Sequence, residues 1–171
     1  FKFGDIFFGV NICEDIWHKN GPTRQEAFCG AKLILNINAS PYYTGKVSLR
    51  EDVIRSQAKG NKLFMVYTNL VGGQDELVFD GQSMVVDDQG KVVQRLEAFR
   101  EDLLPVDSEI PQTRGRCAKT IIKITDKVKE KGRPTLPRRK VEILKPVQEI
   151  YEALSLGLRD YVQKNGFQKV V

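Results

Sequence analysis

The stretch Phe8-Gly9-Val10-Asn11-Ile12-Cys13-Glu14-Asp15-Ile16-Trp17 decides the fold that we expect for this chain. Apolar residues from Ile6 to Ile12 predict a buried strand, which ends at Cys13 and is followed at once by two carboxylates. In α/β folds, a sharp turn after a strand exposes one side chain and leaves the next backbone N–H free for an oxyanion. We therefore interpret Cys13 as a candidate nucleophile, although a lone cysteine after a strand is often only a small core residue.

Strands and helices are predicted to alternate along the sequence after this turn. The sequence predicts helices over residues 23–30 and 47–59, buried strands over residues 33–37 and 63–67, and a hairpin over residues 83–94. A capping box from Thr23 to Glu26 is expected to begin the first helix. We expect a glycine-rich loop over residues 68–81 and an extension of the hairpin over residues 96–104. Strands that alternate with helices of this length predict βαβ units in an α/β fold.

The loop over residues 38–46 follows the second buried strand and should lie beside Cys13, because ligands of α/β sheets bind beyond the carboxyl ends of strands. Within it, Ser40 offers a hydroxyl and Lys46 a cation for the carboxylate of an amino acid. Composition alone would favour a plain surface turn. His18, the one histidine, starts a polar loop with no marked partner, and we assign it no chemistry.

Composition narrows the class of protein. The chain has 171 residues, 41% of them apolar, which suffices for one sizeable core, and no apolar run is long enough to cross a bilayer. We therefore expect no membrane partner. Cys13, Cys29 and Cys117 are an odd number of cysteines without metal-type spacing, so we expect no metal site and a reducing, cytoplasmic setting.

The net charge of +5 comes from one segment. Residues 112–140 hold eleven lysines and arginines against two acidic residues. Such a segment could suit nucleic acid or a phosphate-rich partner, but it has no aromatic residues for base stacking. We interpret it as a solvated connector, whose apolar patch at residues 121–124 forms a little local structure and whose prolines at 134 and 137 discourage helix. We expect no nucleic-acid partner.

The last segment changes character. Apolar residues at helical spacing predict a helix that begins at Pro146 and ends at Asn165-Gly166, and residues 168–171 begin a further strand. One helix and four strand residues bury too little surface to fold alone. We therefore divide the chain into a first domain over residues 1–110, a basic linker over residues 111–145 and the start of a second domain over residues 146–171.

The run from Asn11 to Trp17 resembles the nucleophile motif of the carbon–nitrogen hydrolase (nitrilase) superfamily, in the variant of the glutaminase domain of glutamine-dependent NAD synthetases. The resemblance implies an α-β-β-α sandwich, represented here by its C-terminal half, with Cys13 as the nucleophile and Ser40 and Lys46 as glutamine contacts. It also implies that residues 68–81 close the glutaminase pocket, with Asp80-Gly81 opening the next strand. The segment from Pro146 resembles the opening of the ammonia-dependent synthetase domain.

The same resemblance implies that the chain is a fragment that is inactive alone. The catalytic residues of the family come in the order Glu, Lys, Cys, so the general base and the oxyanion-stabilising lysine would precede residue 1, and the ATP loop would follow Val171. The complete enzyme would take ammonia from glutamine and use ATP and Mg²⁺ to amidate deamido-NAD to NAD, with neither cofactor bound by this fragment. We expect the complete enzyme to be a homo-oligomer.

Two other functions remain compatible with the sequence. A stand-alone nitrilase-type amidase would use the same Cys13 chemistry but has no need of the helix from Pro146. A non-catalytic interaction module would leave Cys13 inert, and labelling with iodoacetamide near neutral pH separates an activated thiol from an inert one. Half of a sandwich exposes an apolar edge and face, so we also expect association or poor solubility.

Overall fold

The computed structural model describes residues 1–117, 121–128, 132, 135–136 and 139–171. The prolines at 134 and 137, which are expected to discourage helix, lie outside the described residues, as does part of the basic segment. The elements, in chain order, are β1 (Lys2–Phe3), β2 (Ile6–Ile12), the 3₁₀ helix η1 (Cys13–Trp17), α1 (Pro22–Phe28), β3 (Leu33–Asn38), α2 (Lys46–Asn61), β4 (Phe64–Asn69), β5 (Val71–Gln74), β6 (Leu77–Asp80), β7 (Met84–Val86), β8 (Val92–Arg95), β9 (Lys123–Thr125) and α3 (Pro146–Lys164).

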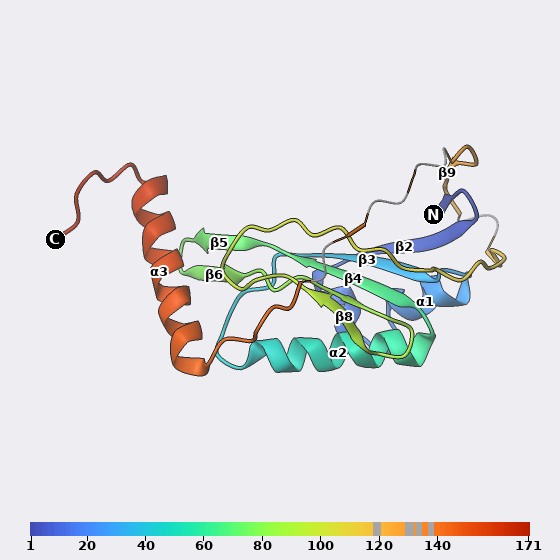
Figure 1. Cartoon of the computed structure of the whole chain (residues 1–171), viewed down its shortest axis with the longest axis horizontal. Helices are drawn as coiled ribbons and strands as arrows, with labels where there is room; N and C mark the ends of the chain where they lie inside the picture. Colours follow the sequence, from blue (N-terminus) through green and yellow to red (C-terminus); the bar gives the residue numbers. More distant parts are fainter. Residues whose placement is uncertain (118–120, 129–131, 133–134, 137–138) are drawn as a thin grey trace.

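The central sheet has the strand order β8-β7-β4-β3-β2-β1-β9 within the described residues (Figure 1). Strands β2, β3 and β4 run parallel, with Val10 opposite Leu35 and Leu35 opposite Val66, while β7 and β8 continue the sheet as an antiparallel hairpin. The α/β fold and its βαβ units are therefore confirmed, and so is the predicted hairpin. The carboxyl ends of the three parallel strands meet at one edge, which is where their following loops must lie.

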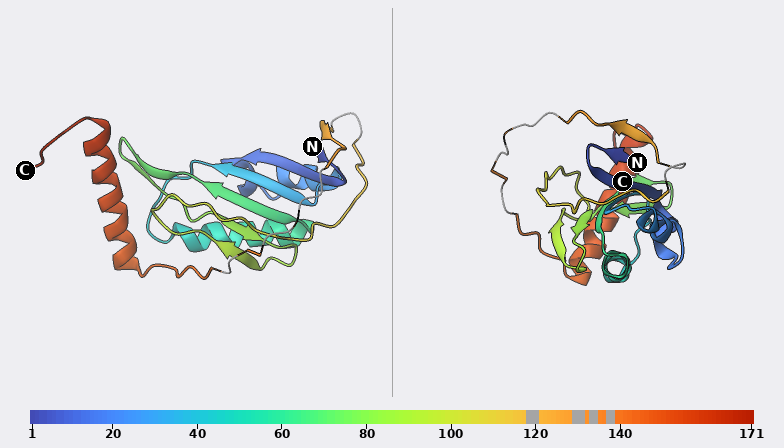
Figure 2. Two further views of the ribbon diagram at one scale, coloured as in Figure 1. Left: turned by 45° about the horizontal axis from the view of Figure 1, so that its top comes forward. Right: turned by 90° about the vertical axis from the view of Figure 1, so that its right-hand side faces the viewer.

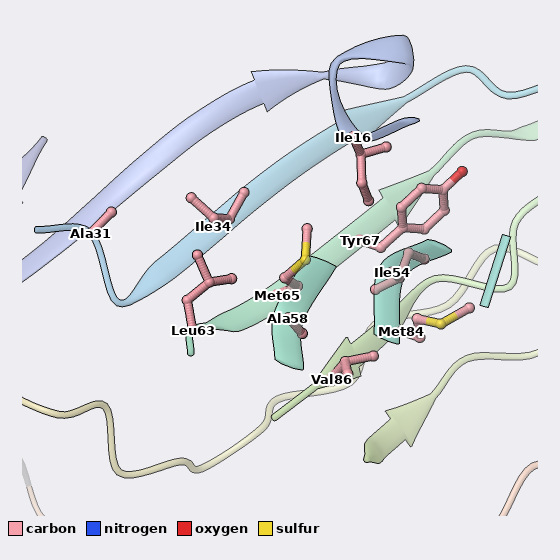
Figure 3. Packing of buried hydrophobic residues seen from close by; sticks show 10 residues of the cluster. All are labelled: Ile16, Ala31, Ile34, Ile54, Ala58, Leu63, Met65, Tyr67, Met84 and Val86. Atoms are coloured by element: carbon pink, nitrogen blue, oxygen red, sulfur yellow. The ribbon is translucent and has the colours of Figure 1, made fainter. Parts of the chain in front are cut away.

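Helices α1 and α2 cover one face of this sheet (Figure 2). The core lies between that face and the helices, where Ile34 of β3 and Met65 of β4 pack with Ile54 and Ala58 of α2, all fully buried (Figure 3). Because side chains of a strand alternate between faces, Leu35 and its neighbours point to the opposite side. Burial of this one apolar face fixes the register of the parallel strands.

The opposite face of the sheet is covered incompletely. Residues 96–106 border a cavity of about 520 Å³ together with Ile37, Val66 and Thr68 of that face. At the carboxyl ends of β2 and β3, Ile12 is 66% exposed and Ile37 56% exposed. Apolar surface on this face is thus exposed as expected, and the association that we expect from it stays a prediction.

Three predictions between residues 68 and 104 are wrong. Residues 71–80, expected as a loop, form the hairpin β5–β6, in which Val71 pairs with Asp80 and Gln74 with Leu77. Asp80 therefore ends a strand instead of opening the next one. Residues 96–104 form no strand, because Phe99 has a left-handed φ of +57° and only an isolated bridge joins Gly81 to Ala98.

The predicted C-terminal helix is confirmed as α3, which packs against the hairpin β5–β6 (Figure 1). The contact is close because both sides are glycine: a Cβ on Gly73 would lie 3.0 Å from the Cα atom of Gly157. The Gly73 N–H also donates to the Asp160 carboxylate at 2.7 Å. Residues 168–171 do not form the predicted strand, since no described strand lies beside them to pair with.

The described parts of the basic linker are fastened to the domain, so its interpretation as a solvated connector is wrong at these points. Strand β9 pairs with β1, which confirms the expected local structure, and Arg139 binds the Asp102 carboxylate at 2.6 and 2.9 Å. Cys29 and Cys117 form a disulfide that the sequence analysis did not predict. Their separation of 88 residues makes this a tertiary contact that spacing does not reveal.

Candidate active site

Cys13 lies directly after β2, as the first residue of η1, and is half-buried. Its φ of +45° is left-handed, a conformation that costs free energy for a residue with a Cβ. The turn is held from both sides: Ile12 donates its N–H to the Asp15 carboxylate at 2.9 Å, and Gln57 of α2 donates to the Ile16 carbonyl at 2.7 Å. The strained turn that the strand end predicts for a nucleophile is present.

A buried polar network lies beneath this turn. Asn11 donates to the Thr23 hydroxyl at 3.1 Å and to the Glu26 carboxylate at 2.9 Å, and it accepts a hydrogen bond from Asn36 at 2.7 Å. Burial raises the pKa of Glu26, and the hydrogen bond from Asn11 opposes that rise. The predicted capping box is therefore wrong: Gly21 caps α1, and Thr23 and Glu26 bind the strand that leads to Cys13.

The loop after β3 carries Ser40 and Lys46, as predicted. Ser40 is buried, and its N–H donates to the Asn69 side-chain oxygen at 2.9 Å. Lys46 is the first residue of α2, and its Nζ donates to the Pro41 carbonyl at 2.7 Å. The Ser40 backbone and the Lys46 side chain are thus both held at the carboxyl end of the sheet.

Strand pairing brings the starts of the two loops together. Ile12, which precedes Cys13, is paired with Ile37 of the neighbouring parallel strand, and the loop of Ser40 and Lys46 follows that strand. The pKa of Lys46 is lowered by burial and by the charge of Arg50, while Asp80, Cys13 and Glu14 act in the opposite direction. Cys13 and this loop therefore follow adjacent strands at the same end of the sheet.

Tyr67 on β4 belongs to the buried core. It is fully buried, and burial raises the pKa of its hydroxyl, whereas Arg50 and the hydrogen bond with Ser40 lower it and Asp80 and Cys13 raise it. The hydrogen bond with Ser40 links Tyr67 to the loop after β3.

An ion pair that is buried on both sides lies next to Tyr67. Arg50 of α2 donates two hydrogen bonds of 3.0 Å to the carboxylate of Asp80, and its guanidinium lies 5.5 Å from the centre of the Tyr67 ring. Burial disfavours the charge on Arg50, but the hydrogen bonds and the charge of Asp80 outweigh it and raise the pKa of Arg50. Asn69 and Gln82 donate to the same carboxylate at 3.3 and 3.1 Å.

Tyr67, Arg50 and the role of Asp80 were not predicted from the sequence. One signal was available: the buried face of α2 includes Val47, Ile54 and Ala58, and Arg50 falls on the same face. A charged residue on the apolar stripe of a helix needs a buried partner. The partner itself, thirty residues away on a hairpin that was predicted to be a loop, could not be identified by pattern.

Other features contribute no site. His18 is exposed, and the loop in which it lies meets α2 through its backbone carbonyl, which accepts from Gln57 at 3.2 Å. Among the described residues no group of three or more His, Cys, Asp or Glu side chains could hold a metal ion. In the same part of the chain, no helix combines the length and the hydropathy that crossing a membrane requires.

The fold and the site define a class: an α/β protein with a cysteine at a strained strand end and a polar loop after the neighbouring parallel strand. The family model of carbon-nitrogen hydrolases matches residues 1–115, so the chain belongs to the carbon–nitrogen hydrolase family. This confirms the superfamily resemblance of the motif around Cys13.

Known relatives extend the similarity beyond the family match. The chain is 45% identical to a glutamine-dependent NAD(+) synthetase of Aquifex aeolicus, over 94% of this chain and 30% of the relative, and 42% identical to one of Thermotoga maritima, over 99% and 32%. The solved structure of the Acinetobacter baumannii glutamine-dependent NAD+ synthetase superposes with a TM-score of 0.77 at 32% identity, over 99% of this chain and 28% of that one. The chain thus spans about a third of these relatives' length.

Proposed function

We propose that this chain supplies the nucleophile and the glutamine-binding loop of a glutamine-dependent NAD synthetase. The observation that carries the proposal is the placement of Cys13 at a strained turn, on the strand adjacent to the one that the loop of Ser40 and Lys46 follows. Similarity to the curated synthetases also continues through α3, beyond the end of the family match at residue 115. This continuation favours a synthetase over a stand-alone amidase, which has no need of α3.

In the proposed reaction, the Cys13 thiolate attacks the side-chain amide carbon of glutamine, the C–N bond breaks, and ammonia leaves as a glutamyl thioester forms. Water then cleaves the thioester and releases glutamate. Lys46 is suited to the α-carboxylate of glutamine and Ser40 to a hydrogen bond with its polar groups. The N–H of Glu14 follows the nucleophile and is the backbone donor available for the oxyanion.

The general base and the second oxyanion donor are proposed to come from a glutamate and a lysine that precede residue 1 in the complete enzyme. Loss of one oxyanion donor typically costs about 3–4 kcal/mol of activation free energy. We therefore propose that the 171-residue chain by itself hydrolyses glutamine negligibly. Steady release of ammonia by this chain, abolished by Cys13→Ala, would contradict that proposal.

The ammonia is proposed to serve ATP-dependent amidation of deamido-NAD in a synthetase domain that begins at Pro146. ATP, Mg²⁺ and deamido-NAD are assigned no ligand among the residues of this chain, and the complete enzyme is proposed to be a cytoplasmic homo-oligomer. In a reducing cytoplasm, Cys29 and Cys117 would meet a thiol pool that opposes their disulfide.

The test is NAD formation by the full-length protein with glutamine or with ammonia as the nitrogen source. Wild type is expected to use both, and Cys13→Ala only ammonia, with Cys29→Ala as the matched control that keeps both activities. Absence of NAD formation from either source in wild type would overturn the assignment. Retention of glutamine use in Cys13→Ala would overturn the role of Cys13.

A further inference from the structure

The buried face of α3 is not the face that carries most of its large apolar side chains. Its apolar residues Tyr151, Leu154 and Leu158 are 68%, 69% and 62% exposed, whereas Ala153 and Leu156 are almost fully buried at 5% and 3%. The buried pair packs in a small cluster with Phe99 and Tyr42. A helix that begins after the linker therefore contacts the loop between Ser40 and Lys46.

Tyr42 is fixed by contacts from three directions. Its N–H donates to the Val78 carbonyl of β6 at 2.7 Å, its ring meets Phe99 edge-on with centroids 5.3 Å apart, and it packs in the cluster that contains Ala153 and Leu156. Its hydroxyl is buried, and the Thr44 and Glu149 side chains lie near enough to influence its pKa. The ring is the part that packs with Phe99 and the cluster residues of α3.

A displacement of Tyr42 would move its two neighbours in the chain, and both of them bind Lys46. The preceding Pro41 supplies the carbonyl that accepts from Lys46 Nζ at 2.7 Å, and the following Tyr43 supplies the carbonyl that accepts from the Lys46 N–H at 3.1 Å. Both groups that hold Lys46 therefore flank the residue that α3 contacts.

A charge on α3 also faces the same site. Glu149 is buried at 8% exposure, and its pKa is raised by burial and by the charge of Asp80, with Tyr42 and Arg50 acting in the opposite direction. The first turn of α3 thus carries a buried carboxylate near Tyr42.

We propose that Tyr42 is a positioning residue through which α3, by its Ala153 and Leu156 side chains, holds the loop of Ser40 and Lys46 in its glutamine-binding geometry. The inference rests on the proposed function and deepens it. The affinity for glutamine is then set partly by the segment after the linker, and not by residues 1–110 alone. Misplacement of a binding group by about 1 Å can cost about a hundredfold in rate, so a packing contact suffices for a large effect.

The experiment uses the full-length protein and measures the KM for glutamine and, separately, NAD formation driven by ammonia. Tyr42→Ala and Leu156→Ala are each expected to raise the KM for glutamine about tenfold while ammonia-driven synthesis changes little. Tyr42→Phe keeps the ring and should retain the wild-type KM. Leu154→Ala, which removes an exposed leucine of the same helix, is the matched control and should leave the KM for glutamine unchanged.

A double-mutant cycle tests the proposal even if one of the single variants is less stable than the wild type. Tyr42→Ala and Leu156→Ala together should raise the KM little beyond either alone, because both remove one contact. Additive effects, an equal rise for Leu154→Ala, or equal losses of glutamine-driven and ammonia-driven synthesis would overturn the inference. A wild-type protein without glutamine-driven synthesis would instead overturn the proposed function itself.

Discussion

The two loops that meet at the carboxyl edge of the sheet are held in different ways. The turn of Cys13 has one local bond, from the Ile12 N–H to Asp15, and one bond from a distant residue, Gln57 of α2. The loop of Ser40 and Lys46 has local bonds from Lys46 to the Pro41 and Tyr43 carbonyls, and it is also held by Asn69 on β4 and by the packing of Tyr42 in the cluster that contains residues of α3. The nucleophile turn therefore depends on α2, whereas the substrate loop depends on β4 and α3.

This difference predicts which substitutions damage which half of the site. Changes in the residues of β4 and α3 that hold the loop of Ser40 and Lys46 should impair glutamine binding while leaving the reactivity of Cys13 intact. Changes near Cys13 should have the opposite selectivity. Four substitutions test the comparison.

The largest effect is expected for the buried pair. Arg50→Met leaves the Asp80 carboxylate without its cation in a site that excludes water, and removal of one partner of such a pair costs about 3–5 kcal/mol. Urea denaturation of the chain, followed by the fluorescence of Trp17, measures the loss in the free energy of unfolding. The double variant Arg50→Met/Asp80→Leu should recover part of the lost free energy of unfolding. A loss below about 1 kcal/mol for Arg50→Met alone would contradict the presence of an unpaired buried charge.

A smaller loss is expected for Asn69→Ala. This change removes the acceptor of the Ser40 N–H and the donor to Asp80, and unsatisfied buried groups cost about 1–3 kcal/mol. In the full-length protein it should also raise the KM for glutamine without slowing the alkylation of Cys13 by iodoacetamide. Asn61→Ala, which removes bonds within α2, is the control. Equal losses of glutamine affinity and of Cys13 reactivity would break the distinction between the loops.

Asp15→Ala tests the local turn. The lost hydrogen bond from the Ile12 N–H is solvent-exposed, so the expected loss is only about 1 kcal/mol, measured by the same denaturation. The alkylation rate of Cys13 should change more than the KM for glutamine. Asp5→Ala, also in an exposed position, controls for the loss of charge. A change in glutamine affinity alone would show that the bond to Asp15 does not hold the turn of Cys13.

The smallest effect concerns the network beneath Cys13. Because burial raises the pKa of Glu26 above its ordinary value of 4.5, folding favours its protonated form, and its contribution to stability is full below pH 4.5 and lost as pH rises through the raised pKa. Glu26→Gln keeps an acceptor for Asn11 and removes this dependence. Wild type should therefore lose stability relative to the variant between pH 4 and pH 7. Glu14→Gln, an exposed control, should not reproduce that trend.

The local elements of the fold could be predicted from the sequence, because they rest on periodicity. The apolar run into Cys13 and the helical spacing after Pro146 identify β2 and α3 directly. The hairpin β5–β6 was missed because Gly72 and Gly73, which let α3 lie close, are typical of loops.

Some residues of the candidate site could likewise be predicted from the sequence, and others could not. Cys13, Ser40 and Lys46 follow strands and could be proposed by position and by resemblance. Arg50 with Asp80, and Tyr42 with α3, join residues about thirty or more positions apart, and no single-sequence pattern records such a pair. The disulfide between Cys29 and Cys117 belongs to this second group.

The most direct test of the account is to map the covalent adduct that a diazoketone analogue of glutamine forms with the full-length protein. Peptide mass spectrometry should find one adduct, on Cys13, and excess glutamine should prevent its formation. An adduct on Cys29, Cys117 or His18, or alkylation of Cys13 that glutamine does not slow, would contradict the central claim that Cys13 and the Ser40–Lys46 loop form one glutamine site.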